Sequence, residues 1–418
     1  MKVKRAYKTE LKPNEGQRVL LARHAGASRF AYNWGLSRKA MAYQLAGKSP
    51  SAIDLHRELN SLKKTDFPWL YEVSKCAPQE ALRDLDRAFK NFFRRVDLKR
   101  KGKHKGKVGF PRFKSRKRGM GSFRLTGSIN LEYSRVKLPR LGWIRLKESG
   151  YLPAESDLLH ILSATVSERA GRWFVSLQVE EERQRSEQTQ GPAVGIDLGV
   201  KTLAAISYGQ DEHVHYENPK ALYAGARKLR RLQKKLSRQE KGSTRREVTK
   251  KKIARQHYRI SCVRSDSIHK ATSSVVAKAK PPPERPRLIG IEDLNVSGMM
   301  KNHKLARSIA DASMREFRRQ IAYKCDWYGI ELVVVPRYEP TSKPCSRCGW
   351  IKEDLNLSDR TFGCEACGHM ADRDDNAADN IRLLAVSSTE RINGRGGDIR
   401  PLSFERQMPE KRQLKLVG

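Results

Sequence analysis

No run of about 18 apolar residues occurs in this 418-residue chain, so we expect no transmembrane helix. The first residues, MKVKRAYKTELKP, lack the apolar stretch of a signal peptide, which argues against secretion. Cysteine is scarce, with seven residues, and four of these form two CxxC pairs, a spacing that favours metal binding over disulfide bonds. These absences predict a cytoplasmic protein in a reducing compartment.

Acidic residues are also scarce relative to basic ones. The chain has 46 Asp and Glu residues against 85 Lys and Arg residues, which gives a formal net charge of +39. Such a charge opposes compaction unless a polyanion neutralises it, and release of counterions would then favour binding. We therefore expect a nucleic-acid partner; the alternative is a solvated basic surface with no specific partner.

The first 182 residues predict a small β-barrel with a helical insertion. Residues 1–12 and several segments within 97–182 alternate apolar and polar residues, as strands do. Ala170, Gly171 and Arg172 separate the last two of these strands as a hairpin turn. Residues 13–96 have helical periodicity, which predicts that they fold as an insertion between the strands.

The last helix of this insertion and the basic stretch after it are candidates for nucleic-acid contact. Aromatic residues repeat at helical spacing over about 77–96, which favours a buried core face over a platform that stacks bases. The stretch 99–118 is too polar for a core and predicts a loop on a nucleic-acid backbone, where Phe110 and Phe113 either stack on bases or point inward. The candidate contacts are Arg94, Arg95, Lys103, Lys105, Arg112 and Lys114.

A second domain begins after the polar segment 183–192, which ends in Gly-Pro. A long basic helical pair is expected over roughly 219–280, and a further helix over 308–329. Residues 386–418 lack periodicity and predict a flexible tail. Strands are expected at 194–197, 202–206, 213–216, 288–291 and 330–336.

Three acidic residues stand at the ends of predicted elements. Asp197 ends one apolar strand, Glu292 follows another, and Asp374 opens a helix. A single Asp after a strand is usually a strand-end cap, but two strands and a helix can bring three carboxylates to one edge of a sheet. Carboxylates are the ligands that Mg²⁺ prefers, and two Mg²⁺ ions would promote phosphodiester cleavage.

Two CxxC pairs separated by 15 residues are the strongest local motif. Each pair turns two thiolates towards one ion, and Gly after the second Cys suits the tight turn. The spacing predicts one structural Zn²⁺ in a closed zinc ribbon, with free thiols or iron as alternatives. Cys76, Cys262 and Cys325 have no such spacing and are expected to be packing residues, and His369 is not needed as a ligand. The predicted zinc ligands are Cys345, Cys348, Cys364 and Cys367.

In combination, these motifs resemble the TnpB family of bacterial insertion sequences, which is related to the type V CRISPR effectors and has a RuvC-like nuclease of RNase H fold. The resemblance spans nearly the whole chain and implies a bacterial or archaeal protein of the cytosol or nucleoid. It rests on ELKPNEGQ, SRFAYNWGL, NFFRR, VGFPRFK, VKLPRLGWIRLK, GIDLGVKTLA, DLNVSGM, SDRTFGCEACG and DRDDNAADN.

The resemblance implies a multidomain α+β architecture. Its parts would be a wedge-like β-barrel (1–12 and 97–182), an inserted helical recognition lobe (13–96), an RNase H-like, RuvC-like α/β nuclease domain (193–340 and 369–385), an inserted zinc ribbon that binds target nucleic acid (341–368) and the flexible tail (386–418). It also implies a guide RNA from the end of the element and a double-stranded DNA target beside a short adjacent motif.

Asp374 fits the DxNAA pattern of the resemblance, since it lies two residues before Asn376; Asp372 and Asp375 are near alternatives. Residues 309–314, IADASM, lack the Trp that often follows Ser in the family, and Asp375 adds a negative charge to the pattern. We expect neither departure to affect the chemistry. The catalytic, Mg²⁺-binding triad would be Asp197, Glu292 and Asp374.

Lys75 and Gln79 lie four residues apart at the start of a predicted helix, so both side chains could enter one groove of a DNA duplex. The alternative is that they are ordinary exposed polar residues. Taken together, the sequence favours an RNA-guided DNA endonuclease. The alternatives are an RNA-guided DNA-binding regulator with weak cleavage, a transposase that transfers DNA strands, and a zinc-ribbon RNA-binding protein without chemistry.

Overall fold

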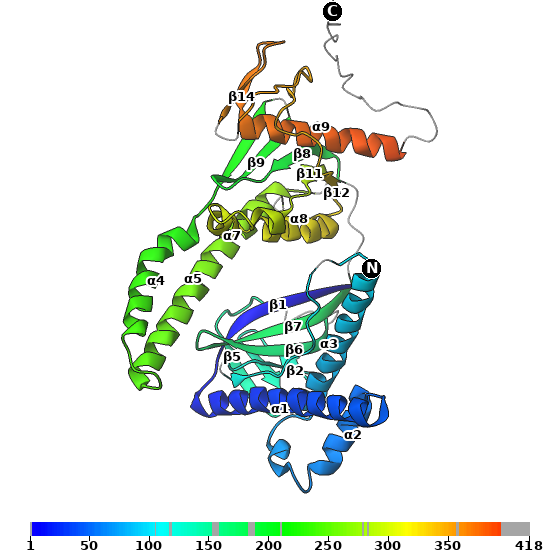
Figure 1. The fold of residues 1–418 in the computed structure, drawn as a ribbon, viewed down its shortest axis with the longest axis vertical. Helices are drawn as coiled ribbons and strands as arrows, with labels where there is room; N and C mark the ends of the chain where they lie inside the picture. The colour runs from blue at the N-terminus through cyan, green and yellow to red at the C-terminus, as the bar shows by residue number, and fades with distance from the viewer. Residues whose placement is uncertain are drawn as a thin grey trace, which may run out of the picture. The chain divides into compact units, whose positions relative to one another are not determined.

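The structure is a computed structural model that describes residues 2–104, 106–116, 119–152, 159–182, 189–209, 211–277, 280–281, 284–356 and 359–393. The chain forms two compact units, Met1–Gln184 with Lys241–Arg255, and Arg185–Glu240 with Gln256–Gly418. Many of their elements are labelled in Figure 1. No helix in the described part of the chain is long and apolar enough to cross a membrane.

The first unit contains an antiparallel sheet of seven strands in the order β2-β6-β7-β1-β5-β4-β3. The end strands β2 and β3 are not paired with each other among the described residues, so the closed barrel that we expected is not confirmed. The strands are β1 (Lys2–Lys12), β2 (Ser122–Leu125), β3 (Asn130–Leu131), β4 (Arg135–Leu138), β5 (Gly142–Leu146), β6 (Leu159–Arg169) and β7 (Arg172–Glu182).

The predicted hairpin joins β6 to β7. Arg169 pairs with Arg172, which leaves Ala170 and Gly171 as a two-residue turn. Their φ angles are 58° and 80°, and tight hairpin turns of this kind need two positive φ values. The sequence therefore predicted the hairpin, but Arg172, which we expected in the turn, is the first residue of β7.

The inserted helices pack on one another around a leucine-rich core. Asn14 caps the first helix by accepting from the backbone N–H of Gln17, and Ser51 caps the second through Asp54. Gly35 lets the third helix pack closely against the first, because a Cβ on Gly35 would lie 2.6 Å from a methyl group of Leu82. The helices are α1 (Glu15–Ala46), α2 (Ala52–Leu62), the short 3₁₀ helix η1 (Pro68–Glu72) and α3 (Cys76–Arg100).

The aromatic face of α3 is buried only over its first half. The rings of Phe89 and Phe92 each pack edge-on against Phe110, with centroids 5.3 Å apart, and Phe93 contacts both helix aromatics. Phe93 is 60% exposed and Phe110 is 51% exposed. The expectation of a wholly buried face was therefore wrong for the C-terminal half of α3, where the apolar pattern continues beyond the helical core.

The second unit contains a five-stranded sheet in the order β10-β9-β8-β11-β12. The strands β10, β9 and β8 are antiparallel neighbours, whereas β8, β11 and β12 run parallel. All five strands were expected from the sequence. They are β8 (Gly191–Asp197), β9 (Thr202–Gly209), β10 (Glu212–Glu217), β11 (Pro286–Glu292) and β12 (Glu331–Val335).

Helices flank this sheet, and α9 (Arg373–Asn393) lies along β8, β9 and β11 (Figure 1). The helix continues through Asn393, so residues 386–393 are helical and the predicted start of the tail at 386 was wrong. The rest of that tail, 394–418, lies outside the described residues. The other helices are α4 (Ala221–Ser237), α5 (Thr244–Val275), α6 (Val296–Met299), α7 (Ala306–Ala312) and α8 (Met314–Tyr328).

The single helix predicted over 308–329 is two helices. Ser313 separates α7 from α8 with a φ of 55°, a left-handed conformation that ends one helix and starts the next. The break lets Ile309 and Phe317, which are 2% and 0% exposed, both be buried. Helix propensity along the sequence does not reveal this break, because Ser is tolerated in helices. Tertiary packing determines where the helix breaks.

Candidate active site and metal centre

Asp197 and Glu292 lie at the same edge of the second sheet. They are the last residues of β8 and β11, which are parallel neighbours with Ile196 paired to Ile291. Because the next position on each strand follows the same register, the two carboxylates come from adjacent strand ends. This is the juxtaposition that the sequence predicted.

Asp374 reaches the same region from the first turn of α9. Its Oδ2 atom lies 4.0 Å from the position that a Cβ on Gly199 would take, in the turn directly after β8. Gly199 itself has no room for a side chain, since its Cβ would lie 2.6 Å from the carbonyl oxygen of Thr202. The turn after β8 is therefore tight, and it brings the start of α9 close to Asp197.

The electrostatics show that the three carboxylates interact. Burial, then the charges of Glu292 and Asp374, raise the pKa of Asp197 to about 8, against a lowering effect of Arg373. Burial and Asp372 also raise the pKa of Asp374. Among the described residues, only the four cysteines below place all their ligand atoms within 4.8 Å of one another, so the carboxylates converge more loosely than a closed metal cage.

The two acidic neighbours of Asp374 have other partners. Asp375 Oδ1 lies 2.6 Å from Nε2 of His215 on β10, and Asp372 Oδ1 accepts a hydrogen bond of 2.8 Å from the backbone N–H of Asp374. One turn further along α9, Asp379 lies 3.1 Å from His213. The pairs Asp375–His215 and Asp379–His213 fasten α9 to β10.

Glu292 is connected to the zinc-ribbon segment by residues that the sequence reasoning missed. Thr341 donates a hydrogen bond from its hydroxyl to Glu292 Oε1. Asn380 of α9 donates to the carbonyl oxygens of Thr341 and Pro344, both at 2.8 Å. Asn376 donates to Pro344 at 2.8 Å and accepts from the N–H of Ser346 at 2.9 Å. The spacing of the two asparagines, one helical turn apart, was the available signal.

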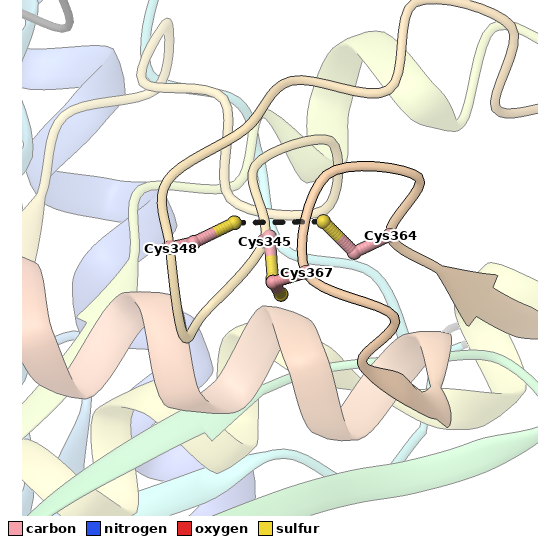
Figure 2. A group of neighbouring side chains, drawn as sticks. All are labelled: Cys345, Cys348, Cys364 and Cys367. Atoms are coloured by element: carbon pink, nitrogen blue, oxygen red, sulfur yellow. Dashed lines mark hydrogen bonds between the residues drawn. The ribbon is translucent and has the colours of Figure 1, made fainter.

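The four predicted zinc ligands come together (Figure 2). The sulfur atoms of Cys345 and Cys367 are 3.7 Å apart, and those of Cys348 and Cys364 are 3.5 Å apart. Four thiolates that bind one Zn²⁺ tetrahedrally have S–S distances of about 3.8 Å, given Zn–S bonds of about 2.3 Å. The cluster therefore has the donor set and the size for a structural zinc ion.

The two halves of the cluster are built alike. In each, the N–H of a glycine bonds to the first cysteine's carbonyl: Gly349 to Cys345 at 2.9 Å and Gly368 to Cys364 at 3.0 Å, with φ angles of 78° and 70°. Although burial opposes it, hydrogen bonds to the Cys364 sulfur lower the pKa of that thiol to about 7. A two-stranded hairpin, β13 (Thr361–Gly363) and β14 (Met370–Asp372), carries the second half.

The remaining cysteines differ from one another. Cys76 and Cys325 are buried, and burial raises the pKa of Cys325 to about 12, as for a packing residue. Cys262 is exposed, so its predicted packing role was wrong. His369 contributes only its carbonyl oxygen, which accepts from the N–H of Cys364.

Known proteins resemble the chain over almost its whole length. A "Putative RNA-guided DNA endonuclease" of Streptomyces pristinaespiralis is 36% identical over 397 residues, which cover 93% of this chain and 90% of that one. The chain belongs to the TnpB family. A second TnpB relative, "Putative RNA-guided DNA endonuclease InsQ" of Escherichia coli K12, is 34% identical over 91% of this chain and 92% of its own.

Parts of this TnpB chain also match described domain families. Residues 176–303 match a "Probable transposase" family, 315–381 a "Cas12f1-like, TNB domain" and 1–48 a "Helix-turn-helix domain". Over 1–48 the structure has β1 and the single helix α1, with no turn between two helices.

A solved structure shares the fold of this TnpB chain. It is a cryo-EM structure of the Cas12f1-sgRNA-target DNA complex, similar with a TM-score of 0.55 and 14% identity over 91% of this chain and 99% of that one.

Lys75 of this TnpB chain lines a pocket of about 840 Å³ in the first unit. It is exposed at the start of α3, whereas Gln79 is half-buried and does not line the pocket. The pocket is basic, since Lys63, Lys137 and Arg140 also line it. Burial and the charge of Lys75 lower the pKa of Lys63, as expected where cations gather.

The other predicted nucleic-acid contacts lie on α3 and the loop after it. Lys114 is already engaged with the protein: its ammonium lies 3.9 Å from the ring centroid of Tyr32, and Asn33 makes two hydrogen bonds to its backbone. Lys105 lies outside the described residues. Arg94, Arg95, Lys103, Arg112 and Lys114 are all exposed.

Proposed function

We propose that this protein is an RNA-guided DNA endonuclease of a transposable element, which cleaves DNA beside a short adjacent motif. The observation that carries the proposal is the approach of Asp197, Glu292 and Asp374 at one sheet edge, where burial and the charges of Glu292 and Asp374 raise the pKa of Asp197 to about 8. The names of the most similar relatives support it. The net charge of +39 supports a nucleic-acid partner.

The architecture of the second unit supports a RuvC-like nuclease domain. Three antiparallel strands followed by two parallel ones, with α9 across the sheet, give the strand arrangement that the RNase H fold implies. Asp197 and Glu292 lie at the carboxyl ends of two parallel strands. In open α/β sheets, ligands bind at such ends.

The residues fit two Mg²⁺ ions, because carboxylates are the donors that this cation prefers, and bound cations would offset the burial and the neighbouring charges that raise the pKa of Asp197. Two bound Mg²⁺ ions would stabilise the attacking and leaving oxygens of phosphodiester hydrolysis. Asp197 and Glu292, fixed on rigid strands, would hold one side of this centre, and Asp374 would close it from α9. Water attacks phosphorus, the P–O bond to the leaving oxygen breaks, and that oxygen takes up a proton.

Zinc in the Cys₄ cluster would be structural. Four thiolates fill a tetrahedral site and leave no open position for a substrate. The ribbon is attached to α9 through Asn376 and Asn380 and to Glu292 through Thr341, so a correctly folded ribbon would help to hold the active site.

The guide RNA would supply sequence specificity by base pairing, while the protein reads the short adjacent motif. Lys75, on the basic pocket of the first unit, would contact that motif, with Gln79 one turn along α3. Phosphate contacts would come from the α3 arginines and the loop after them, namely Arg94, Arg95, Lys103, Lys105, Arg112 and Lys114. Since Lys114 lies on Tyr32, its contribution would require it to leave that ring.

The test is to purify the protein from cells that carry its native flanking DNA and to sequence the RNA that accompanies it. We expect one discrete RNA that ends at the element boundary, whose 3′ extension defines a DNA target cleaved with Mg²⁺. Heterogeneous RNA, with no cleavage of any target that it specifies, would contradict the proposal. Joining of a labelled donor end would instead favour a strand-transferring transposase.

A further inference from the structure

A second pocket, of about 200 Å³, opens beside Glu292 and has no role in the chemistry described above. One wall is apolar, and Met314, at the position where the resembled family often has Trp, belongs to it. Three arginines also line the pocket. The lining residues are Leu198, Glu292, Leu294, Asn295, Val296, Ser297, Met314, Arg315, Arg318 and Arg337.

Two of the three arginines are held in place by one carboxylate. Asp293 accepts hydrogen bonds of 2.6 Å from Arg318 and 2.7 Å from Arg337, and Arg337 also donates to the Asp293 carbonyl oxygen at 2.9 Å. One side of the pocket is therefore rigid before any ligand binds.

Arg315 differs from these two. Its side chain makes no ion pair or hydrogen bond within the described part of the chain, although it lines the same pocket. The helix break at Ser313 places it in the first turn of α8. With three arginines against the carboxylates of Glu292 and Asp293, the pocket retains an excess positive charge, so it is suited to an anion.

We propose that this pocket binds the nucleotide adjacent to the scissile phosphate of a DNA strand, with Arg315 bound to its phosphate and the apolar wall against its sugar. The inference rests on the proposed function, because Glu292 forms part of both sites. A guanidinium binds two phosphate oxygens at once, which fixes orientation as well as charge. Arg315 is thus a positioning residue that aligns the strand with the carboxylates.

The test compares Arg315→Ala with a matched control, Arg319→Ala. Arg319 lies one turn further along α8, carries the same charge and pairs with Glu316 at 2.7 Å, but it does not line the pocket. With guide RNA and saturating target, we expect Arg315→Ala to lower the single-turnover cleavage rate about tenfold or more, with the Kd for target DNA within about twofold. Arg319→Ala should change neither, and Arg315→Lys should recover only part of the rate.

Equal cleavage rates for the Arg315→Ala and Arg319→Ala variants would overturn the inference while leaving the proposed function intact. If the wild type does not cleave, the proposed function fails, and a crosslinking experiment tests the pocket instead. A single-stranded oligonucleotide carrying 4-thiothymidine is then photo-crosslinked to the RNA-bound protein. An adduct on peptides containing Leu294–Ser297 or Met314, lost in Arg315→Ala and kept in Arg319→Ala, would support the pocket; its absence or persistence would overturn it.

Discussion

A Cβ atom on Gly195 would lie 2.0 Å from the carbonyl oxygen of Ala378, so helix α9 rests directly on the backbone of strand β8. Gly290 on β11 has the same relation to α9, where a Cβ would lie 2.9 Å from the carbonyl oxygen of Ile381. The two glycines set the height of α9 above the sheet. They thereby set the distance of Asp374 from the strand ends that carry Asp197 and Glu292.

Gly195→Ala should therefore separate α9 from β8. Because the obstructing atom is backbone, the added methyl group should cost about 1–3 kcal/mol of stability and displace Asp374, which lowers cleavage more than it lowers target binding. Thermal melting and cleavage rates measure the two effects. Gly26→Ala is the control, since a Cβ there has no neighbour within 4 Å and helical Ala is favourable. Unchanged melting of Gly195→Ala would contradict the packing described.

The raised pKa of Asp197 predicts a pH-dependent cost in the Mg²⁺-free protein. An unfolded Asp has a pKa of about 3.9, whereas that of Asp197 is about 8, so folding takes up a proton between these values. This group therefore destabilises the fold increasingly as pH rises from about 4 to 8. In Mg²⁺-free buffer that retains zinc, Asp197→Asn should melt at least about 2 °C above the wild type at pH 8, and the difference should shrink towards pH 5. Equal melting temperatures of the wild type and the variant at pH 8 would contradict a buried Asp197 carboxylate close to other acidic groups.

Asp374 and Asp375 should differ in their effect on cleavage. Asp374→Asn should abolish it, because this carboxylate is close enough for its charge to raise the pKa of Asp197. Asp375→Asn loses the charged partner of His215 but leaves Asp374 in place, so cleavage should fall by about tenfold or less. The measurement is a single-turnover rate over a Mg²⁺ titration. Complete loss of cleavage in the Asp375 variant alone would assign the catalytic role to Asp375 instead of Asp374.

The zinc ribbon should affect cleavage without taking part in chemistry. Cys345→Ser together with Cys348→Ser should remove the bound zinc and lower cleavage, because the ribbon positions Thr341 against Glu292. Asn376→Ala should keep the zinc and still lower cleavage, since it removes one of the two asparagine links between the ribbon and α9 and leaves the Ser346 N–H unpaired, at a cost of about 1–3 kcal/mol. Zinc content is measured with a colorimetric chelator. Full zinc in the double Cys variant would refute the Cys₄ assignment.

Local patterns in the sequence were sufficient for several features. The CxxC spacing predicted the cysteine cluster, because ligand geometry is encoded within each short turn. The apolar runs before Asp197 and Glu292 predicted the strands of the second sheet, and parallel pairing brings their ends together.

Features that depend on tertiary packing were not predictable in this way. The break at Ser313, the exposure of Phe93 and the extension of α9 through Asn393 depend on which surfaces meet in the fold. The link from Asn380 through Thr341 to Glu292 joins residues far apart in the sequence. No periodicity records such contacts.

The most direct test of the account is cleavage of a plasmid whose target matches the co-purified RNA, by wild type and by Asp197→Ala, with Mg²⁺. We expect the wild type to linearise the matched plasmid and to leave a mismatched plasmid intact. Asp197→Ala should bind the matched target but not cut it. Cleavage by Asp197→Ala at the wild-type rate, or equal cleavage of matched and mismatched plasmids, would contradict the account.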